Sequence, residues 1–249
     1  MSISLIIPCY NYEKLLIKNY HKLQKKIKNI NEDFEIIYID DGSTDKTYKK
    51  LNFLKKKNKK IKIIKNRFNF GKSYSLIRGI KHSKYNKIVI YDCDLPYFIY
   101  FNRVINLLKK YSFVYINRRS NESSLEIKNL SFYQLTRFTI GRFICSVINL
   151  FCLNKEIGDT QAGLKAFIKP KKFNKIKFIS KKFFFDAEII ILFSFFKKSM
   201  KYIPIKYQVP KDSTIKIFEF KNFIYVYELL KVIIYYNLTN IKRYKKNLE

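Results

Sequence analysis

The sequence predicts an α/β protein built on a doubly wound, mostly parallel sheet, and two patterns in residues 1–120 carry this prediction. Short, continuous apolar runs alternate with longer Lys-rich segments of helical spacing. Strands that are apolar along their whole length are typical of parallel sheets, because helices cover both faces of such sheets. The polar clusters fall directly after the apolar runs, which is where α/β sheets bind their ligands.

The elements follow from these patterns in order. The apolar runs predict five strands in the first half: Ile3–Ile7, Phe34–Ile39, Ile61–Ile64, Lys87–Tyr91 and Phe113–Ile116. Helical spacing predicts the segments between them: Tyr12–Ile30, Asp45–Lys57, Lys72–His82 and Phe98–Lys110. The second half is less regular, with a strand-like run and three helical segments: Leu164–Ile168, Ser131–Leu153, Phe183–Phe196 and Phe218–Leu238. The last of these helices is aromatic-rich and amphipathic.

The charge balance points to a polyanionic partner. The chain has 51 Lys and Arg against 19 Asp and Glu, a net charge of +32. Nucleic acid, an anionic membrane or phosphorylated substrates fit such a surface, although a general enrichment in Lys, Asn and Ile explains part of the excess. A nucleic-acid-binding protein is disfavoured because the predicted ligand edge is acidic. The four cysteines form no CxxC pair, so neither a zinc site nor a disulfide framework is indicated.

The sharpest chemical signal is a pair of carboxylates after the fourth strand. Asp92 and Asp94 are two residues apart, so both can turn toward one cation once the chain leaves the sheet. Carboxylate oxygens suit Mg²⁺ or Mn²⁺, with substrate phosphates completing the coordination shell. An Asp-rich turn is the alternative, but Asp40 and Asp41 at the same predicted edge favour the metal site.

Two further clusters suit a nucleotide. Asp40-Asp41-Gly42-Ser43-Thr44-Asp45 supplies acceptors for ribose and base groups, while its hydroxyls and Asp45 can cap the next helix. Asn69-Phe70-Gly71-Lys72-Ser73 places a Gly, a Lys and a hydroxyl at a helix start, where backbone N–H groups and the helix dipole favour an anion.

Taken in order, these motifs resemble family 2 inverting glycosyltransferases of the GT-A fold. The resemblance rests on Ile6-Ile7-Pro8-Cys9-Tyr10-Asn11 followed by the Asp40, Asn69 and Asp92 clusters. The later Asp159-Thr160-Gln161-x-Gly163 and Phe185-Asp186-x-Glu188 resemble the polyprenyl- and dolichyl-phosphate sugar transferases, nearest the dolichyl-phosphate β-glucosyltransferase type. The resemblance implies a nucleotide-diphosphate hexose donor, a divalent metal (Mg²⁺ or Mn²⁺) and a polyprenyl phosphate acceptor. We expect UDP-hexose ahead of GDP-hexose.

The expected site has four overlapping sets of residues. The nucleotide-sugar set is Pro8, Tyr10, Asn11, Asp40, Asp41, Ser43, Asn69, Gly71, Lys72 and Asp92. The metal set is Asp92 and Asp94, and the catalytic set is Asp94, Asp159, Arg118, Arg119 and Gln161. The acceptor-phosphate set is Arg118, Arg119, Arg137 and Lys165, since guanidinium groups bind phosphate as a planar fork.

The acceptor determines what else the site needs. A hydroxyl acceptor, such as a glycan, must lose a proton to a general base. A phosphate monoester has a second pKa of about 6 and is already ionised, so it chiefly needs cations. We therefore expect Asp159 to orient the acceptor or its Arg partners rather than to remove a proton.

A nucleotidyltransferase is a rival enzyme class that would also use Asp residues and a metal. It would need a Gly- and Arg-rich loop after the first strand to bind the triphosphate, and residues 8–12 form no such loop.

We expect residues 1–217 to form the GT-A domain, with a nucleotide-sugar half (1–120) and an acceptor half (121–217). Residues 218–249 would add the C-terminal amphipathic helix and a basic tail. We find neither a signal peptide nor a segment apolar enough to span a membrane. The prediction is a cytoplasmic protein, peripheral on the cytoplasmic face of an anionic membrane, with homo-oligomerisation left open. The helices at Ser131–Leu153 and Phe218–Leu238 would either meet the lipid or simply cover the sheet.

Overall fold

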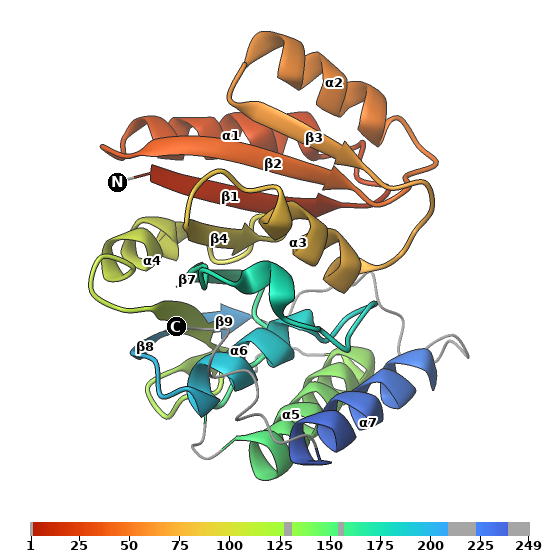
Figure 1. Cartoon of the computed structure of the whole chain (residues 1–249), viewed down its shortest axis with the longest axis vertical. Coiled ribbons are helices and arrows are strands. Elements are labelled where there is room, and N and C mark those ends of the chain that lie inside the picture. Colours follow the sequence, from red (N-terminus) through yellow and green to blue (C-terminus); the bar gives the residue numbers. More distant parts are fainter. Residues whose placement is uncertain (1, 127–130, 154–156, 209–222, 239–249) are drawn as a thin grey trace.

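A computed structural model describes residues 2–126, 131–153, 157–208 and 223–238. Its centre is a seven-stranded sheet with the order β3-β2-β1-β4-β7-β5-β8 (Figure 1). Six strands run parallel, and β7 alone runs antiparallel to its neighbours β4 and β5. The strands are β1 (Ser2–Cys9), β2 (Asp33–Asp40), β3 (Ile61–Lys65), β4 (Lys87–Tyr91), β5 (Phe113–Asn117), β7 (Leu164–Ile168) and β8 (Met200–Pro204). A separate parallel pair joins β6 (Ser124–Glu126) to β9 (Lys206–Gln208).

The helices cover both faces of the sheet. They are α1 (Leu16–Lys28), α2 (Thr47–Lys57), α3 (Lys72–Lys81), α4 (Phe101–Leu107), α5 (Phe132–Cys152), α6 (Phe185–Phe195) and α7 (Phe223–Leu238), with short 3₁₀ turns at Phe98–Tyr100 and Phe173–Lys175. One apolar core joins α1, α2 and α4 to the sheet, and a second joins α3, α6 and α7 to its other face. This two-sided burial explains why the strands are apolar along their length.

The two cores follow from strand alternation. Successive side chains of β1 point to opposite faces, so Ile3, Leu5 and Ile7 enter the first core while Ile6 enters the second. The α6 helix lies in the second core and is buried around its circumference. Its apolar residues therefore lie on every side rather than on one face, and its two carboxylates, Asp186 and Glu188, are buried as well.

The predicted elements of the first half are confirmed to within a few residues, and the α/β fold with them. The predicted strand at Leu164–Ile168 and helix at Ser131–Leu153 are also confirmed, the latter with Ser131 as N-cap. The reversed direction of β7 and the short strands β6, β8 and β9 were not predicted. Part of the predicted last helix, residues 218–222, lies outside the described residues.

One prediction about length needs correction. We expected no segment long and apolar enough to span a bilayer, yet α5 has 21 residues and contains an 18-residue window with a mean hydropathy of 1.3, which suffices by length and composition. Only 12% of its most apolar window is buried within the molecule. It lies beside α7 at the far end of the sheet from β3 (Figure 1).

Candidate active site

The carboxyl ends of the parallel strands gather the polar motifs at one edge. The strands β1, β2, β4 and β5 end at Cys9, Asp40, Tyr91 and Asn117. Because β7 is antiparallel, the loop before it, residues 157–163, enters the sheet from this same edge. Two contacts fix that loop: Asp92 N donates to the carbonyl of Gly163 at 2.9 Å, and Asn117 Nδ2 donates to the carbonyl of Ile157 at 3.1 Å.

The carboxylate pair Asp92 and Asp94 lies on the loop after β4. Lys72 Nζ lies 2.7 Å from Asp92 Oδ1, and 30% of the Asp92 side chain is exposed. Asp94 is exposed at the surface of the loop. Desolvation by the surrounding protein and then the charge of Asp92 raise the pKa of Asp94 above its ordinary value. The two carboxylates thus lie close enough to interact, as a shared cation site requires.

This donor set fits a hard divalent cation that takes its other ligands from a substrate. Within the described residues no three His, Cys, Asp or Glu side chains are grouped for metal binding. Two carboxylates with further oxygens from a diphosphate match the way Mg²⁺ is commonly held. Gly163 leaves the space for this arrangement, since a Cβ there would overlap the Asp92 carboxylate and lie 3.1 Å from Pro96 Cγ.

Asp40 and Asp41 differ in what they bind. Asp41 is buried and accepts three hydrogen bonds, from Asn66 Nδ2 (2.7 Å), Phe70 N (3.1 Å) and Gly71 N (2.8 Å). Its carboxylate therefore holds the 66–71 loop. Asp40 Oδ1 accepts from Ser43 N at 3.3 Å, whereas its buried Oδ2 accepts no hydrogen bond from the described part of the chain. Burial raises the pKa of Asp40, which leaves it as the better placed of the two to receive a ligand donor.

The loop after β1 and the loop after β2 are joined by hydrogen bonds. Asn11 N donates to Ser43 Oγ at 3.0 Å, and Asn11 Oδ1 accepts from Thr44 N at 2.9 Å. Asn11 itself has a left-handed φ of 47°. Pro8 lies beside Ile39 in the β1–β2 pair, and Tyr10 is 47% exposed. Tyr10 thus presents a free aromatic surface, while Asn11 and Ser43 join the two loops.

The start of α3 is less available to a phosphate than the sequence predicted. The N–H groups of Phe70 and Gly71 are bound by Asp41, as described above. Ser73 N and Tyr74 N donate to the carbonyls of Lys182 and Lys181, both at 3.0 Å. These four amides are thus paired within the protein, and the side chain of Lys72 is the group that reaches the site. Asn69 is exposed.

Lys72 also joins a buried chain of alternating charges. Its Nζ lies 3.0 Å from Asp186 Oδ2 in α6, and Lys165 Nζ lies 2.9 Å from Asp186 Oδ1. Burial alone would lower the pKa of Lys72, but Asp186 and Asp92 outweigh it and raise that pKa above its ordinary value. Lys165 is fully buried and also donates to the carbonyl of Ala162. We predicted that Lys165 binds an acceptor phosphate; its burial instead makes it part of the scaffold under the site.

The carboxylate of Asp159, in the loop that we predicted to lie near the acceptor, is paired with Arg118. The Arg118 guanidinium binds it through both Nε and Nη2, the latter 2.9 Å from Oδ1, and Gln161 N donates to the same Oδ1 at 3.0 Å. Burial alone would raise the pKa of Asp159, but the charge of Arg118 outweighs it and holds that pKa well below the ordinary range. Arg118 is 17% exposed and lies over the ring of Tyr207.

Unpaired donors lie beside this ion pair. Arg119 Nε, Arg119 Nη1 and Gln161 Nε2 are buried and have no hydrogen-bond partner in the described part of the chain. Buried polar groups without a protein partner point to a ligand. Arg137 lies on α5, and its side chain falls outside what the structure describes.

Tyr97 connects the two halves of the edge. Burial raises the pKa of its phenol; the positive charge of Arg118 then opposes that rise, and the carboxylates of Asp159 and Asp92 add to it. The Tyr97 side chain therefore lies close enough to interact electrostatically both with Asp92, after β4, and with the Arg118–Asp159 ion pair. Sequence alone does not predict this position, because Tyr97 only continues the chain after Asp94 and its spacing from Asp159 is large.

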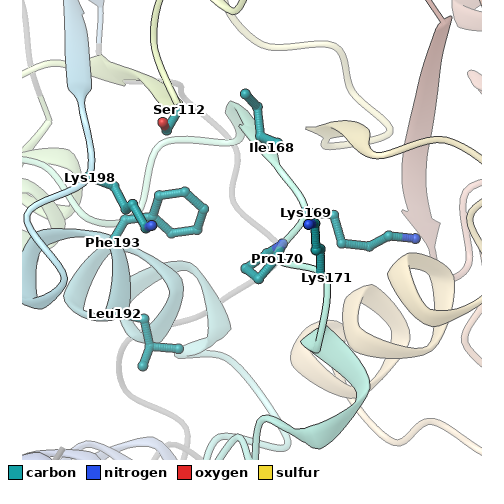
Figure 2. A pocket seen from close by; sticks show the side chains of 8 residues that line it. All are labelled: Ser112, Ile168, Lys169, Pro170, Lys171, Leu192, Phe193 and Lys198. Carbon is teal, nitrogen blue, oxygen red and sulfur yellow. The ribbon is translucent and has the colours of Figure 1, made fainter. Parts of the chain in front are cut away.

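A pocket at the opposite edge is separate from this constellation. Figure 2 shows it, with Ser112, Ile168, Pro170, Phe193 and three lysines among its lining residues. Ser112 precedes β5 and Ile168 ends β7, so the pocket lies at the amino ends of the parallel strands. Lys169 at its rim donates to Ser83 Oγ at 2.7 Å. None of the predicted site residues lines it.

Known sequences give matches across most of the chain. A dolichyl-phosphate beta-glucosyltransferase of Trichomonas vaginalis is 24% identical over 95% of this chain and 74% of its own length. An uncharacterized glycosyltransferase of Synechocystis sp. is 33% identical over 57% of this chain. A dolichol-phosphate mannosyltransferase of Pyrococcus furiosus is 32% identical over 39% of it. The chain spans 45% of the Synechocystis relative and 27% of the Pyrococcus one.

Solved structures share the fold at low identity. Glucosyl-3-phosphoglycerate synthase of Mycobacterium tuberculosis, in complex with Mn²⁺, UDP-glucose and phosphoglyceric acid, matches with a TM-score of 0.64 and 14% identity. That match covers 93% of this chain and 79% of the other. TarS of S. aureus with UDP matches with a TM-score of 0.55 and 16% identity, over 100% of this chain and 70% of the other. The fold is therefore GT-A.

The family itself follows from the sequence model. The model of glycosyl transferase family 2 matches residues 4–152, which contain β1 to β5 and the clusters around Asp40, Asp41, Asp92 and Asp94. This chain belongs to glycosyl transferase family 2.

Proposed function

We propose that this chain transfers a hexose from a nucleotide-diphosphate sugar, UDP-hexose ahead of GDP-hexose, to a polyprenyl phosphate, with inversion at the anomeric carbon. In this proposal the donor binds within residues 1–120, and residues 121–217 bind the acceptor together with Arg118 and Arg119 at the end of the first half. Relatives named as dolichyl- and undecaprenyl-phosphate sugar transferases support the acceptor class. Structural neighbours that hold UDP-glucose and Mn²⁺ support the donor class.

The observation that carries the proposal is the state of Asp159. Both of its oxygens are bound by Arg118, and one also accepts from Gln161 N. A carboxylate held in this way is a weak base, because protonating it would leave the buried guanidinium of Arg118 without a counter-charge. An acceptor that must be deprotonated would be poorly served here. A phosphate monoester, already ionised near neutral pH, needs donors instead, and Arg119 and Gln161 supply unpaired ones.

The transfer is a single in-line displacement. An oxygen of the acceptor phosphate attacks the anomeric carbon, the bond from that carbon to the leaving diphosphate oxygen breaks, and nucleoside diphosphate departs. A divalent cation, Mg²⁺ or Mn²⁺, held by Asp92 and Asp94 would supply Lewis-acid neutralisation of the diphosphate charge. Lys72 adds a fixed positive charge beside Asp92, and Arg118 and Arg119 position the incoming phosphate.

The surface of α5 and α7 supports action at a membrane, and in this proposal the chain lies on the cytoplasmic face. Large apolar side chains on α5 are well exposed, among them Phe132 (81%), Phe143 (68%) and Leu150 (77%). On α7, Tyr227 is exposed with Lys231 Nζ 4.3 Å from its ring centroid. Interfacial helices combine such apolar and aromatic groups with Lys and Arg. A lipid-linked acceptor would reach the site from this side of the molecule.

A panel of donors and acceptors tests the proposal. The purified chain is incubated with UDP- or GDP-sugars and Mg²⁺ or Mn²⁺, together with a short polyprenyl phosphate or the corresponding polyprenol. We expect a glycolipid from the phosphate and none from the alcohol. Glycosylation of the alcohol or of a free glycan instead, with none of the phosphate, would replace this acceptor class by a hydroxyl acceptor. Asp94→Asn serves as the inactive control.

A further inference from the structure

Helix α7 is bound to the protein through a buried carboxylate that points at backbone amides. Glu228 is 7% exposed and accepts three hydrogen bonds, from Lys181 N (2.6 Å), Lys182 N (2.7 Å) and Phe183 N (2.8 Å). Three consecutive amides on one carboxylate form a strong local contact, because hydrogen bonds to a charged acceptor are stronger than neutral ones. Glu228 thus fixes the backbone of the 181–183 segment.

The same segment holds the first turn of α3. The carbonyls of Lys182 and Lys181 accept from Ser73 N and Tyr74 N. Ser73 Oγ lies 2.9 Å from Ser180 Oγ, which in turn accepts from Phe184 N at 2.7 Å. The fit is close, since a Cβ on Gly71 would lie 2.7 Å from Lys182 Cα. Displacing this segment must therefore displace the start of α3.

The start of α3 carries Lys72, whose ammonium lies between Asp92 and Asp186. A continuous set of contacts therefore runs from Glu228 on α7, through the 180–184 loop, to the carboxylate motif at the sheet edge. We infer that Glu228 is a positioning residue for the donor site, acting through the 180–184 loop on Lys72. The inference rests on the proposed function for the identity of the donor, but the linkage itself stands on these contacts.

This linkage gives α7 a role beyond covering α6. The outer side of α7 is exposed, with Ile224, Val226 and Leu230 among its apolar residues. Its inner side is joined through Glu228 to the 180–184 loop, and this loop binds the first turn of α3, which carries Lys72. The position of α7 and the geometry of the donor site are thereby coupled through backbone hydrogen bonds rather than through side chains in the site.

Two measurements on Glu228→Gln test the inference. Hydrogen exchange of the unliganded protein should show faster exchange across residues 70–76. Calorimetric titration with UDP in the presence of Mn²⁺ should show affinity weakened by about fivefold, the lower range of energetic coupling between sites. Glu228→Asp, which keeps the charge, should recover part of the affinity. Ser180→Ala is a milder second variant, should Glu228→Gln fold poorly, and should shift both readouts in the same direction.

Glu35→Gln is the matched control. Glu35 is also a buried carboxylate on a backbone amide, accepting from Lys84 N and Ser4 Oγ at 2.5 Å each, but it lies near the amino end of β2. It should lower stability without changing UDP affinity or exchange at 70–76. Unchanged exchange in the Glu228 and Ser180 variants would overturn the linkage, and changed exchange with unchanged UDP affinity would overturn the positioning role. Should the unmodified chain fail to bind UDP while exchange still changes, the linkage stands and the proposed donor fails.

Discussion

Two carboxylates of the candidate site, Asp94 and Asp159, have opposite electrostatic environments. Desolvation and the neighbouring Asp92 raise the pKa of Asp94. Burial pushes the pKa of Asp159 in the same direction, but Arg118 reverses the effect and lowers it. Desolvation and a like charge both disfavour the ionised form of Asp94, and a bound cation would oppose both effects, whereas the lowered pKa of Asp159 reflects a cation already present within the protein. Local partners therefore assign the two residues to different tasks.

This difference gives a direct test in Asp159→Asn. The substitution removes the charge that orients Arg118, so we expect a higher KM for polyprenyl phosphate with turnover reduced but measurable. Folding stability should also fall by about 3 kcal/mol, the lower range for breaking a buried ion pair, because Arg118 is 17% exposed. Steady-state kinetics well below the melting temperature provide the measurement. A loss as complete as that in Asp94→Asn would contradict the orienting role.

Gly163 is the residue on which the position of Asp92 depends. In Gly163→Ala the new Cβ would lie 2.8 Å from Asp92 Cγ, so the carboxylate must move. Moving a group at a reacting site by about 1 Å costs about 100-fold in turnover, and we expect a loss of this order in Gly163→Ala. The control is Gly79→Ala, whose Cβ would lie 2.7 Å from Ile39 Cδ1 and Ile6 Cγ2 in the core. That variant should lose about 1–3 kcal/mol of stability and keep its turnover per folded molecule; equal turnover in both variants would refute the role of Gly163.

At the scale of elements, α6 and α7 are joined by a second buried carboxylate. Glu188 on α6 accepts from Ile179 N, Ser180 N and Tyr236 Oη of α7. Burial raises the pKa of Glu188 to about 7, and the hydrogen bonds only partly oppose it. The protonated form is therefore favoured in the folded chain, relative to an ordinary value of 4.5.

The sign of this shift predicts how stability changes with pH. The contribution of Glu188 is fully present below pH 4.5 and is lost as pH rises through about 7. The loss amounts to at most about 3 kcal/mol. Denaturant unfolding from pH 4.5 to 8 should show the decline, and Glu188→Gln should flatten it. Glu122→Gln, at an exposed carboxylate that binds Tyr202 Oη, should leave the curve parallel to that of the unmodified chain. A decline that persists in Glu188→Gln would assign it to other groups.

Sequence patterns predicted the elements better than their pairing. Largely apolar runs located β1 to β5, because burial on both faces leaves few polar positions within a strand. The run at Leu164–Ile168 looks the same whether a strand is parallel or antiparallel. The reversal of this strand could therefore not be predicted, although it brings Gly163 beside Asp92 and the loop with Asp159 to the same edge of the sheet.

The site was predicted as a cluster but not as a set of contacts. Polar residues after successive strands had to gather at one edge, which located Asp40, Asp92 and Asp94. Spacing along the chain contains no information on partners from distant elements. We therefore predicted that the Lys165 ammonium was available to a phosphate, although Asp186 of α6 binds it within the core. Glu228 gave no signal, because its partners are backbone amides of another segment.

At the scale of the whole molecule, charge and apolar surface must be considered together. The net charge of +32 alone would suit many polyanions. Helices α5 and α7, which both carry exposed apolar residues, lie side by side at one end of the molecule (Figure 1). Together with the charge, they favour the proposal of a partner with both anionic and apolar groups. An anionic lipid surface has both. Each basic residue close to such a surface contributes about 1 kcal/mol, and the contribution falls with salt.

Vesicle flotation tests this surface. We expect the chain to float with vesicles that contain anionic lipid, less so with neutral vesicles, and less so at high salt. Phe143→Ser with Leu150→Ser removes two exposed apolar side chains from α5, each of which contributes about 1.5–3 kcal/mol when buried. Binding should therefore weaken by more than tenfold. Phe53→Ser is the control, since Phe53 is 50% exposed on α2, outside this surface. An unmodified chain that floats with neither kind of vesicle would exclude peripheral attachment, and the lipid phosphate would then have to reach the Arg118 and Arg119 site without help from α5 and α7.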